Sequence, residues 1–136
     1  MGPKYLTLAE VLNLHEQTIA ATGGSFGVRD ETLIDSALAR PRAGFGGFEA
    51  YPDVFSKAGV LLEGLIKNHG FIDGNKRSGA YAFVWFLAKA NALDTTRITP
   101  PALTAITLLV AESDPAHKDK MIGLVLTMLT VGKKKK

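Results

Sequence analysis

Apolar residues recur at helical spacing along most of the chain, and polar signals mark where each segment starts and stops. The pattern at residues 7–10 is a capping box, in which a hydroxyl and a carboxylate satisfy each other's backbone N–H groups, and an apolar stripe follows it. A Gly-Gly pair at 23–24 ends this first helix. Asp30 caps a second, shorter helix that ends at Pro41.

The segment at residues 42–51 is rich in Gly and Phe, and it interrupts the helical pattern. It is typical of an exposed loop or a small hairpin, in which Phe45 and Phe48 are not expected to be core residues. No period-two pattern longer than this segment occurs, so any sheet is expected to be confined to it.

The rest of the chain predicts four more helices. Pro52 and Asp53 open the third helix, whose apolar residues form one broad stripe. The fourth helix starts near Asn75 and is almost wholly apolar over residues 80–88, so we expect it to be the buried central helix. The pattern therefore predicts an all-α fold of about six helices with a small flap loop or hairpin. The last two helices are expected at roughly 101–112 and 117–131.

The chain has 136 residues, which favours a single domain, and 46% of them are hydrophobic, enough to build a core. We expect that domain to cover residues 6–131, followed by a disordered basic tail at 132–136. No cysteine is present, so any chemistry must use imidazole, carboxylate, amide or cationic groups. Neither a leader peptide nor a membrane-spanning run is evident, and we expect a cytoplasmic protein without a membrane partner.

The formal charge of +3 depends on four lysines at 133–136, and without them 12 basic residues face 13 acidic ones. The body of the protein is therefore nearly neutral, and its pI does not indicate nucleic-acid binding. A helix-turn-helix DNA-binding protein remains an alternative because some helices are short. No helix carries clustered Arg and Gln for base recognition, so we expect no direct contact with nucleic acid.

Residues 68–79 stand apart because they gather polar groups between two apolar helices. The free N–H groups and the positive dipole at the start of the second of these helices form an anion site. Gly74 lets the backbone approach a ligand closely. Lys76 and Arg77 place two cations on the same first turn, where they oppose the helix dipole unless a phosphate is bound.

Two further groups flank this anion site. Asp73 is suited to a Mg²⁺ ion, which takes one or two carboxylates and completes its shell with phosphate oxygens and water. An imidazole titrates near neutral pH, so His69 could take a proton from an attacking hydroxyl. Phe71 is expected to point into the core and pin the loop. A base, a metal ligand, an anion site and two cations within nine residues indicate transfer from a nucleoside triphosphate.

Each of these residues also has an ordinary structural explanation. A histidine in a helix–helix loop is often only hydrogen-bonded, Asp-Gly is a common turn pair, and Asn75 could act as a helix cap. Lys76 and Arg77 could form a solvated face. This explanation gives no reason for all of them to share one loop. The other two histidines are expected to be peripheral, His15 as a surface residue of the first helix and His117 at the start of the last one.

The run from His69 to Arg77 resembles the signature of the Fic family, in the Asn-Lys-Arg form typical of death-on-curing (Doc) toxins of type II toxin–antitoxin systems. The resemblance extends over residues 6–129, and the nine-residue motif is its specific part. It implies a six-helix Fic core. Further segments resemble Doc-type ones in the expected order, at residues 27–30, 36–41, 45–47 and 51–52.

The resemblance also implies roles for individual residues, with ATP as the substrate and Mg²⁺ as the metal. His69 would be the general base that activates a target hydroxyl, and Asp73 would bind Mg²⁺. A flap ahead of the motif would pin an extended target segment by main-chain bonds. The phosphate-binding residues would be Gly74, Asn75, Lys76 and Arg77, and the flap would comprise Phe45, Gly46 and Gly47.

Lys76 decides which reaction the resemblance implies. Fic adenylyltransferases carry Gly at that position, which leaves room for the α- and β-phosphates, whereas a lysine crowds the pocket. In Doc proteins the nucleotide is reversed and the γ-phosphate is transferred, which implies phosphorylation of a threonine of elongation factor Tu and arrested translation. Gly74 replaces the Ala of Doc and also occurs in adenylyltransferases. A nucleotidyl transferase acting on a protein hydroxyl, and a catalytically silent binding protein of the same fold, remain the alternatives.

Many Fic proteins inhibit themselves with a helix in which Ser or Thr stands four positions before a Glu. None of the six glutamates of this chain has Ser or Thr at that position. The resemblance therefore implies an antitoxin in trans, typically a Phd-like partner whose flexible segment folds into a groove near the active site.

Overall fold

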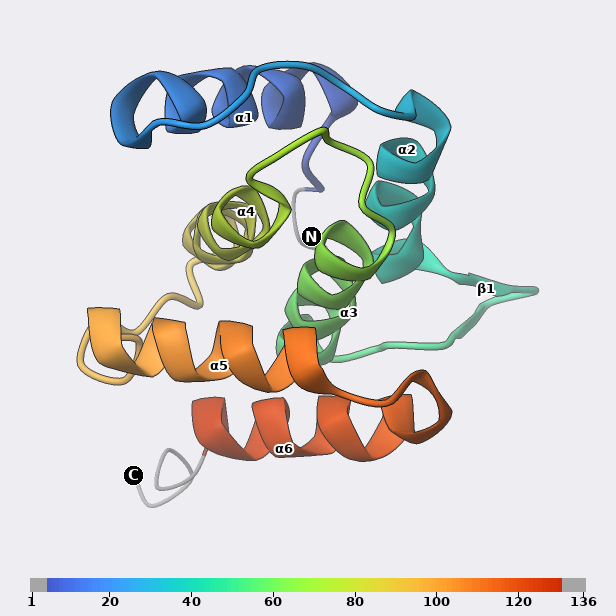
Figure 1. Cartoon of the computed structure of the whole chain (residues 1–136). Helices are drawn as coiled ribbons and strands as arrows, with labels where there is room; N and C mark the ends of the chain where they lie inside the picture. Colours follow the sequence, from blue (N-terminus) through green and yellow to red (C-terminus); the bar gives the residue numbers. More distant parts are fainter. Residues whose placement is uncertain (1–4, 131–136) are drawn as a thin grey trace.

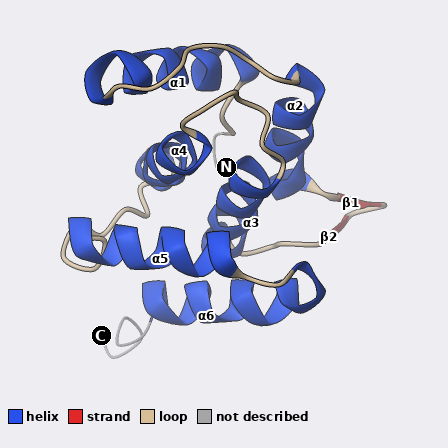
Figure 2. Cartoon of the chain, viewed as in Figure 1, coloured by secondary structure: helices blue, strands red, loops and turns tan. Residues whose placement is uncertain are grey.

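The computed structural model describes residues 5–130, and it is all-α, as predicted. A two-stranded hairpin of β1 (Gly44–Phe45) and β2 (Phe48–Glu49) is the only sheet within that range (Figure 2). The predicted basic tail at 132–136, and Val131 before it, lie outside the described residues. The helices are α1 (Leu8–Thr22), α2 (Glu31–Ala39), α3 (Val54–Lys67), α4 (Asn75–Lys89), α5 (Pro100–Glu112) and α6 (Lys118–Thr130).

The helix starts follow the predicted capping residues. Thr7 and Glu10 form both bonds of a capping box at the start of α1. The side chains of Asp30 and Asp53 accept hydrogen bonds from the first turns of α2 and α3. The second helix was expected to end at Pro41. It is followed directly by a short 3₁₀ turn that includes this proline.

The buried central helix is α3, and the prediction that α4 takes this place was wrong. All residues of α3 from 57 to 66 are buried, because α2, α4, α5 and α6 pack around it (Figure 1). In contrast, α4 leaves Tyr81 45% exposed and Trp85 only partly buried. None of the helices within residues 5–130 combines the length and the apolar character that crossing a membrane requires.

Two charged residues lie within the buried stretch of α3, and each has an ionic partner on a neighbouring segment. The Nζ of Lys57 donates to Glu49 Oε1 at 2.7 Å and to the carbonyl of Pro41 at 3.0 Å. Burial alone would lower the pKa of Lys57, but its hydrogen bonds to Glu49 and Tyr5 outweigh this and raise the pKa above its ordinary value. These bonds fix the base of the hairpin against α3. The second residue, Glu63, pairs with Arg40.

The hairpin projects from the helical body (Figure 2), and its two phenylalanines are exposed. Phe45 and Phe48 face each other across the antiparallel pair and are 81% and 63% exposed. The prediction of an exposed hairpin without core residues is therefore confirmed. An exposed aromatic pair on a short, anchored hairpin is a surface available to another molecule.

Candidate active site

The loop between α3 and α4 lies beneath the connection from α1 to α2 (Figure 1). Phe71 is 2% exposed and anchors the loop in the core, as predicted. The side-chain amide of Asn75 accepts from Phe71 N and donates to Phe71 O, both at 3.0 Å. These two bonds brace the loop. Asn75 is the first residue of α4, so the alternative that it acts as the helix cap was wrong.

Gly74 occupies the cap position of α4, in a left-handed conformation with φ of 78° that favours glycine. No side chain of the described residues caps this helix. The first helical hydrogen bond runs from Ser78 N to Gly74 O at 2.9 Å. The amides of Asn75, Lys76 and Arg77 therefore have no carbonyl of their own helix to bind, and they lie at the positive end of the helix dipole, which favours an anion.

A pocket of about 400 Å³ opens at this helix start. It brings the predicted base, metal ligand and phosphate-binding residues to one place. The walls come from the end of α3, the motif loop, the first turn of α4 and the end of α5. Its lining residues are Ile66, Lys67, His69, Ile72, Asp73, Gly74, Asn75, Lys76, Arg77, Ala111 and Glu112.

The far wall of the pocket is fixed by Lys67, which sequence reasoning did not single out. Its Nζ donates to the carbonyl of Ala111 at 3.1 Å and to that of Ser113 at 2.6 Å. These carbonyls belong to the end of α5, where a lysine satisfies orphan acceptors and complements the negative end of the dipole. The ammonium group of Lys67 thus holds the end of α5 against the end of α3.

Asp73 is held in its charged form by backbone amides. Its Oδ2 accepts from Ser25 N at 3.0 Å and its Oδ1 accepts from Gly74 N at 2.8 Å. These two bonds hold the pKa of the Asp73 carboxyl below its usual range. The chain can approach this closely because residue 24 is a glycine: a Cβ at Gly24 would lie 2.5 Å from Asp73 Oδ2.

The surroundings of Asp73 fit a Mg²⁺ ion that is shared with a phosphate ligand. Its carboxylate is ionised and its side chain is 44% exposed. Within residues 5–130 no group of three or more His, Cys, Asp or Glu side chains could form a metal cage. Mg²⁺ is commonly bound by one or two carboxylates together with substrate phosphates, which is the arrangement that Asp73 beside the anion site allows.

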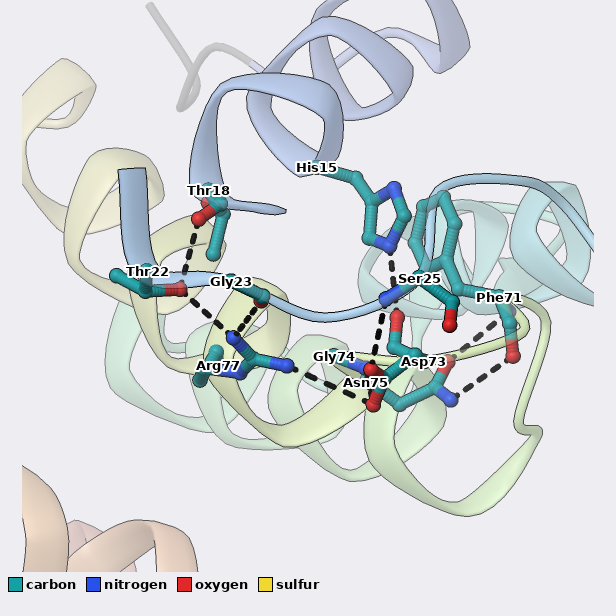
Figure 3. A network of polar contacts seen from close by, with 10 residues as sticks. All are labelled: His15, Thr18, Thr22, Gly23, Ser25, Phe71, Asp73, Gly74, Asn75 and Arg77. Atoms are coloured by element: carbon teal, nitrogen blue, oxygen red, sulfur yellow. Dashed lines mark hydrogen bonds and ion pairs between the residues drawn. The ribbon is translucent and has the colours of Figure 1, made fainter. Parts of the chain in front are cut away.

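The guanidinium of Arg77 connects three parts of the site (Figure 3). Its Nη1 donates to Thr22 Oγ1 at 2.7 Å and to the carbonyl of Gly23 at 2.6 Å. Its Nη2 lies 3.5 Å from Asp73 Oδ1. Arg77 lines the pocket as predicted, but its observed bonds tie the end of α1 to the start of α4.

His15 is a site residue that sequence reasoning missed, and the prediction that it lies on the surface was wrong. It is 3% exposed, and its Nε2 donates to the carbonyl of Asp73 at 2.7 Å (Figure 3). Its ring stacks on Phe71 with centroids 3.8 Å apart and planes 5° apart. The available signal was its spacing of four residues from the buried Val11 and Ile19 on one face of α1.

His117 lies outside the pocket, at the turn before α6. Its side chain is 62% exposed, and its Nδ1 lies 3.8 Å from Asp114 Oδ2. Asp114 caps this turn by accepting from Ala116 N. The placement agrees with the prediction of a peripheral histidine at a helix start.

Replacing Asp73 with Asn is expected to destabilise the protein in a pH-dependent manner. Because the folded pKa lies below the unfolded one, the carboxylate contributes stability above the unfolded pKa near 3.8 and loses it as the pH falls through the folded pKa. Urea unfolding at neutral pH should therefore give a lower free energy of unfolding for Asp73→Asn than for wild type. This difference should become smaller below pH 3.8. A difference of constant size throughout the acid range would contradict this.

The sequence comparisons agree with this geometry. A sequence model described as the Fic/DOC family matches residues 5–87, more than half of the chain, including the whole motif loop. The chain is also 45% identical over 73 residues to a protein described as Toxin Doc from Mycolicibacterium smegmatis (strain ATCC 700084 / mc(2)155). That match covers 54% of this chain and 55% of the relative, so it spans about half the length of the curated protein. The chain belongs to the Fic/DOC family.

Proposed function

We propose that this chain is a Doc-type toxin that transfers the γ-phosphate of ATP to a hydroxyl of a translation factor, such as a threonine of elongation factor Tu, and so arrests translation. The pocket at the start of α4 is the observation that carries the proposal. It combines an exposed imidazole at His69, an ionised carboxylate at Asp73 and the uncapped helix start. These groups suit phosphoryl transfer, which depends on positioning and charge neutralisation.

In the proposed reaction the terminal phosphates of ATP lie against the free amides of α4, with Lys76 beside them. His69 takes the proton from the acceptor hydroxyl, whose oxygen forms a bond to the γ-phosphorus. The bond from that phosphorus to the β–γ bridging oxygen breaks, and ADP leaves. Bound Mg²⁺, held by Asp73, would neutralise phosphate charge. The exposure of His69 supports an acceptor carried by a second protein.

Lys76 supports phosphoryl transfer over nucleotidyl transfer. Its side chain is exposed and lines the pocket at the first turn of α4. Fic adenylyltransferases, which the motif resembles, carry Gly at this position. A lysine there occupies space where the α- and β-phosphates would otherwise lie, which favours the reversed nucleotide.

The test uses ATP labelled in either the γ- or the α-phosphate, with purified protein, Mg²⁺ and elongation factor Tu. We expect label on the acceptor from γ-labelled ATP alone. Label from α-labelled ATP would assign nucleotidyl transfer instead. Absence of transfer from both, to elongation factor Tu and to the proteins of a cell lysate, would contradict a transferase and favour a silent binding protein.

The hairpin is proposed to dock the acceptor, since Phe45 and Phe48 are exposed and Glu49 anchors the hairpin to α3. Replacing both phenylalanines with Ser is expected to raise KM for the acceptor about tenfold, a loss of roughly 1.4 kcal/mol in binding. Stability should change by less than about 0.5 kcal/mol because neither side chain is buried. Steady-state kinetics with varied acceptor and varied ATP will separate the two substrates.

Leu124→Ser provides the matched control for the hairpin variant, because Leu124 is 54% exposed on α6. It should leave both KM values unchanged. An unchanged acceptor KM in the double hairpin variant, or an equal effect in the control, would contradict a docking role for the hairpin.

We also propose that a Phd-like antitoxin restrains this protein in trans. The sequence lacks the Ser/Thr-to-Glu spacing of self-inhibited Fic proteins, and its relative carries the name Toxin Doc. Expression of the chain alone is expected to arrest growth, and co-expression of the small protein encoded beside it should relieve the arrest. Growth arrest that no neighbouring reading frame relieves would contradict the partner.

A further inference from the structure

The segment at residues 27–30 packs against the motif loop, although the proposed reaction gives it no role. Val28 forms an antiparallel bridge with Phe71. The amide of Ile72 donates to the carbonyl of Gly27 at 3.1 Å. The segment thus supplies backbone partners along one side of the loop that carries the proposed base.

Arg29 concentrates the contacts of this segment on the start of the loop. Its own amide and that of Asp30 donate to the carbonyl of Gly70, at 2.8 and 3.0 Å. Its side chain reaches further back along the loop, where Nε donates to the carbonyl of His69 at 2.6 Å and Nη2 donates to that of Asn68 at 3.0 Å. One guanidinium therefore binds two successive carbonyls, a use for which its rigid fork of donors is suited.

His69 needs such support because its backbone is strained. Its φ is +52°, in the left-handed region that residues with a Cβ rarely adopt. Such a conformation persists only where the surroundings over-determine it. The carbonyls on either side of this strained φ, those of Asn68 and His69, are the two that Arg29 binds.

We infer that Arg29 is a positioning residue, which holds the backbone of His69 in its left-handed conformation and thereby directs the imidazole to the phosphate pocket. The inference rests on the proposed role of His69 as the base. Arg29 itself is not among the residues that line the pocket in the described part of the chain. Its guanidinium acts on carbonyl oxygens of the loop, so its effect on turnover passes through His69.

The kinetic test compares Arg29→Ala and Arg29→Lys with Arg97→Ala. Arg97 is the matched control because its Nη1 also donates to a backbone carbonyl, that of Met128 at 3.3 Å, away from the pocket. Arg29→Ala is expected to lower kcat about a hundredfold, the loss typical of a misplaced catalytic group. The Kd of a non-hydrolysable ATP analogue should stay within about twofold of wild type, because nucleotide contacts are retained.

Arg29→Lys keeps the positive charge but has one donor nitrogen in place of the two that Arg29 uses. Its kcat should be about tenfold higher than that of Arg29→Ala, again without a change in nucleotide Kd. Wild-type kcat in Arg29→Ala would overturn the inference. An equal loss in kcat and in nucleotide affinity would also overturn it, since Arg29 would then act on the ligand. If Arg29→Ala does not fold, Arg29→Lys decides: a kcat loss at constant Kd supports the inference, and wild-type kcat overturns it.

A second readout is independent of catalysis and separates this inference from the proposed function. The Ile72 amide, bound to Gly27, reports whether the segment stays docked on the loop. Its protection from hydrogen exchange should fall at least tenfold in Arg29→Ala and remain unchanged in Arg97→Ala. Should wild type lack transferase activity, this measurement decides alone: lost protection supports the positioning of the loop by Arg29, and full protection overturns it.

Discussion

Replacing His69 with Ala is expected to lower phosphoryl transfer by about 10²–10⁴-fold, the usual contribution of a positioned general base. The side chain is exposed at the pocket, so its loss should change stability by less than about 0.5 kcal/mol. Label transfer from γ-labelled ATP measures the first effect and urea unfolding the second. Growth arrest on expression should disappear together with transfer.

His117→Ala is the matched control for this variant. It removes an imidazole that is 62% exposed at the turn before α6, outside the pocket. It should retain transfer and toxicity. If His69→Ala keeps wild-type transfer, His69 is not the base; if toxicity alone survives, the toxic activity does not depend on this chemistry.

Replacing His15 with Ala is expected to destabilise the protein by about 2–4 kcal/mol, since it leaves a cavity and removes a buried hydrogen bond. The ring lost is the one that stacks on Phe71, and the acceptor left without its partner is the carbonyl of Asp73. Transfer activity should also fall, because Asp73 directly precedes Gly74, the cap of the helix that is proposed to bind phosphate. Urea unfolding at neutral pH and steady-state kinetics measure the two effects.

His15→Phe separates the two contributions of His15, because it keeps a ring for stacking but has no donor for the carbonyl. We expect its free energy of unfolding to fall by about 1–3 kcal/mol, the cost of a buried unsatisfied acceptor. This fall should be smaller than that of His15→Ala. A change below about 0.5 kcal/mol in His15→Ala would show that this residue does not brace the loop. Equal losses in both variants would assign the whole effect to the hydrogen bond.

Features that depend on neighbouring residues were predictable from the sequence. The capping box at residues 7–10, and the caps Asp30 and Asp53, act within one helical turn, so their chemistry is visible locally. The same holds for the loop ahead of α4, where the polar residues of the motif are close in sequence and their side chains line one pocket. The family motif within this loop gave the expected fold.

Features that depend on distant partners were not predictable in this way. His15 is buried because its acceptor, 58 residues away, lies against α1. Lys57 and Glu63 would be expected on a solvated face, yet both are buried on α3, where Glu49 and Arg40 come from neighbouring segments to pair with them. Hydrophobicity alone favoured α4, whose apolar run includes residues that remain partly exposed.

The sequence predicted which residues make up the candidate site but not the hydrogen-bond partners of their side chains. Arg77 was expected to contact phosphate, and its spacing does place it on the first turn of α4. Its actual partners, Thr22 and Gly23, come from the end of α1, and no local pattern indicates them. The side chain of Asn75 is likewise used to brace Phe71, which leaves its backbone amide for an anion. The sequence therefore located the residues that line the pocket, while the structure shows which of their side chains also brace neighbouring segments.

An amide NMR titration with a non-hydrolysable ATP analogue and Mg²⁺ tests the phosphate site most directly. If the triphosphate binds at the uncapped start of α4, the largest shifts at saturation should fall on the backbone amides of Asn75, Lys76 and Arg77. Saturating binding that leaves these three amides unmoved, with shifts confined to other parts of the protein, would contradict a phosphate site at this helix and with it the proposed transfer reaction.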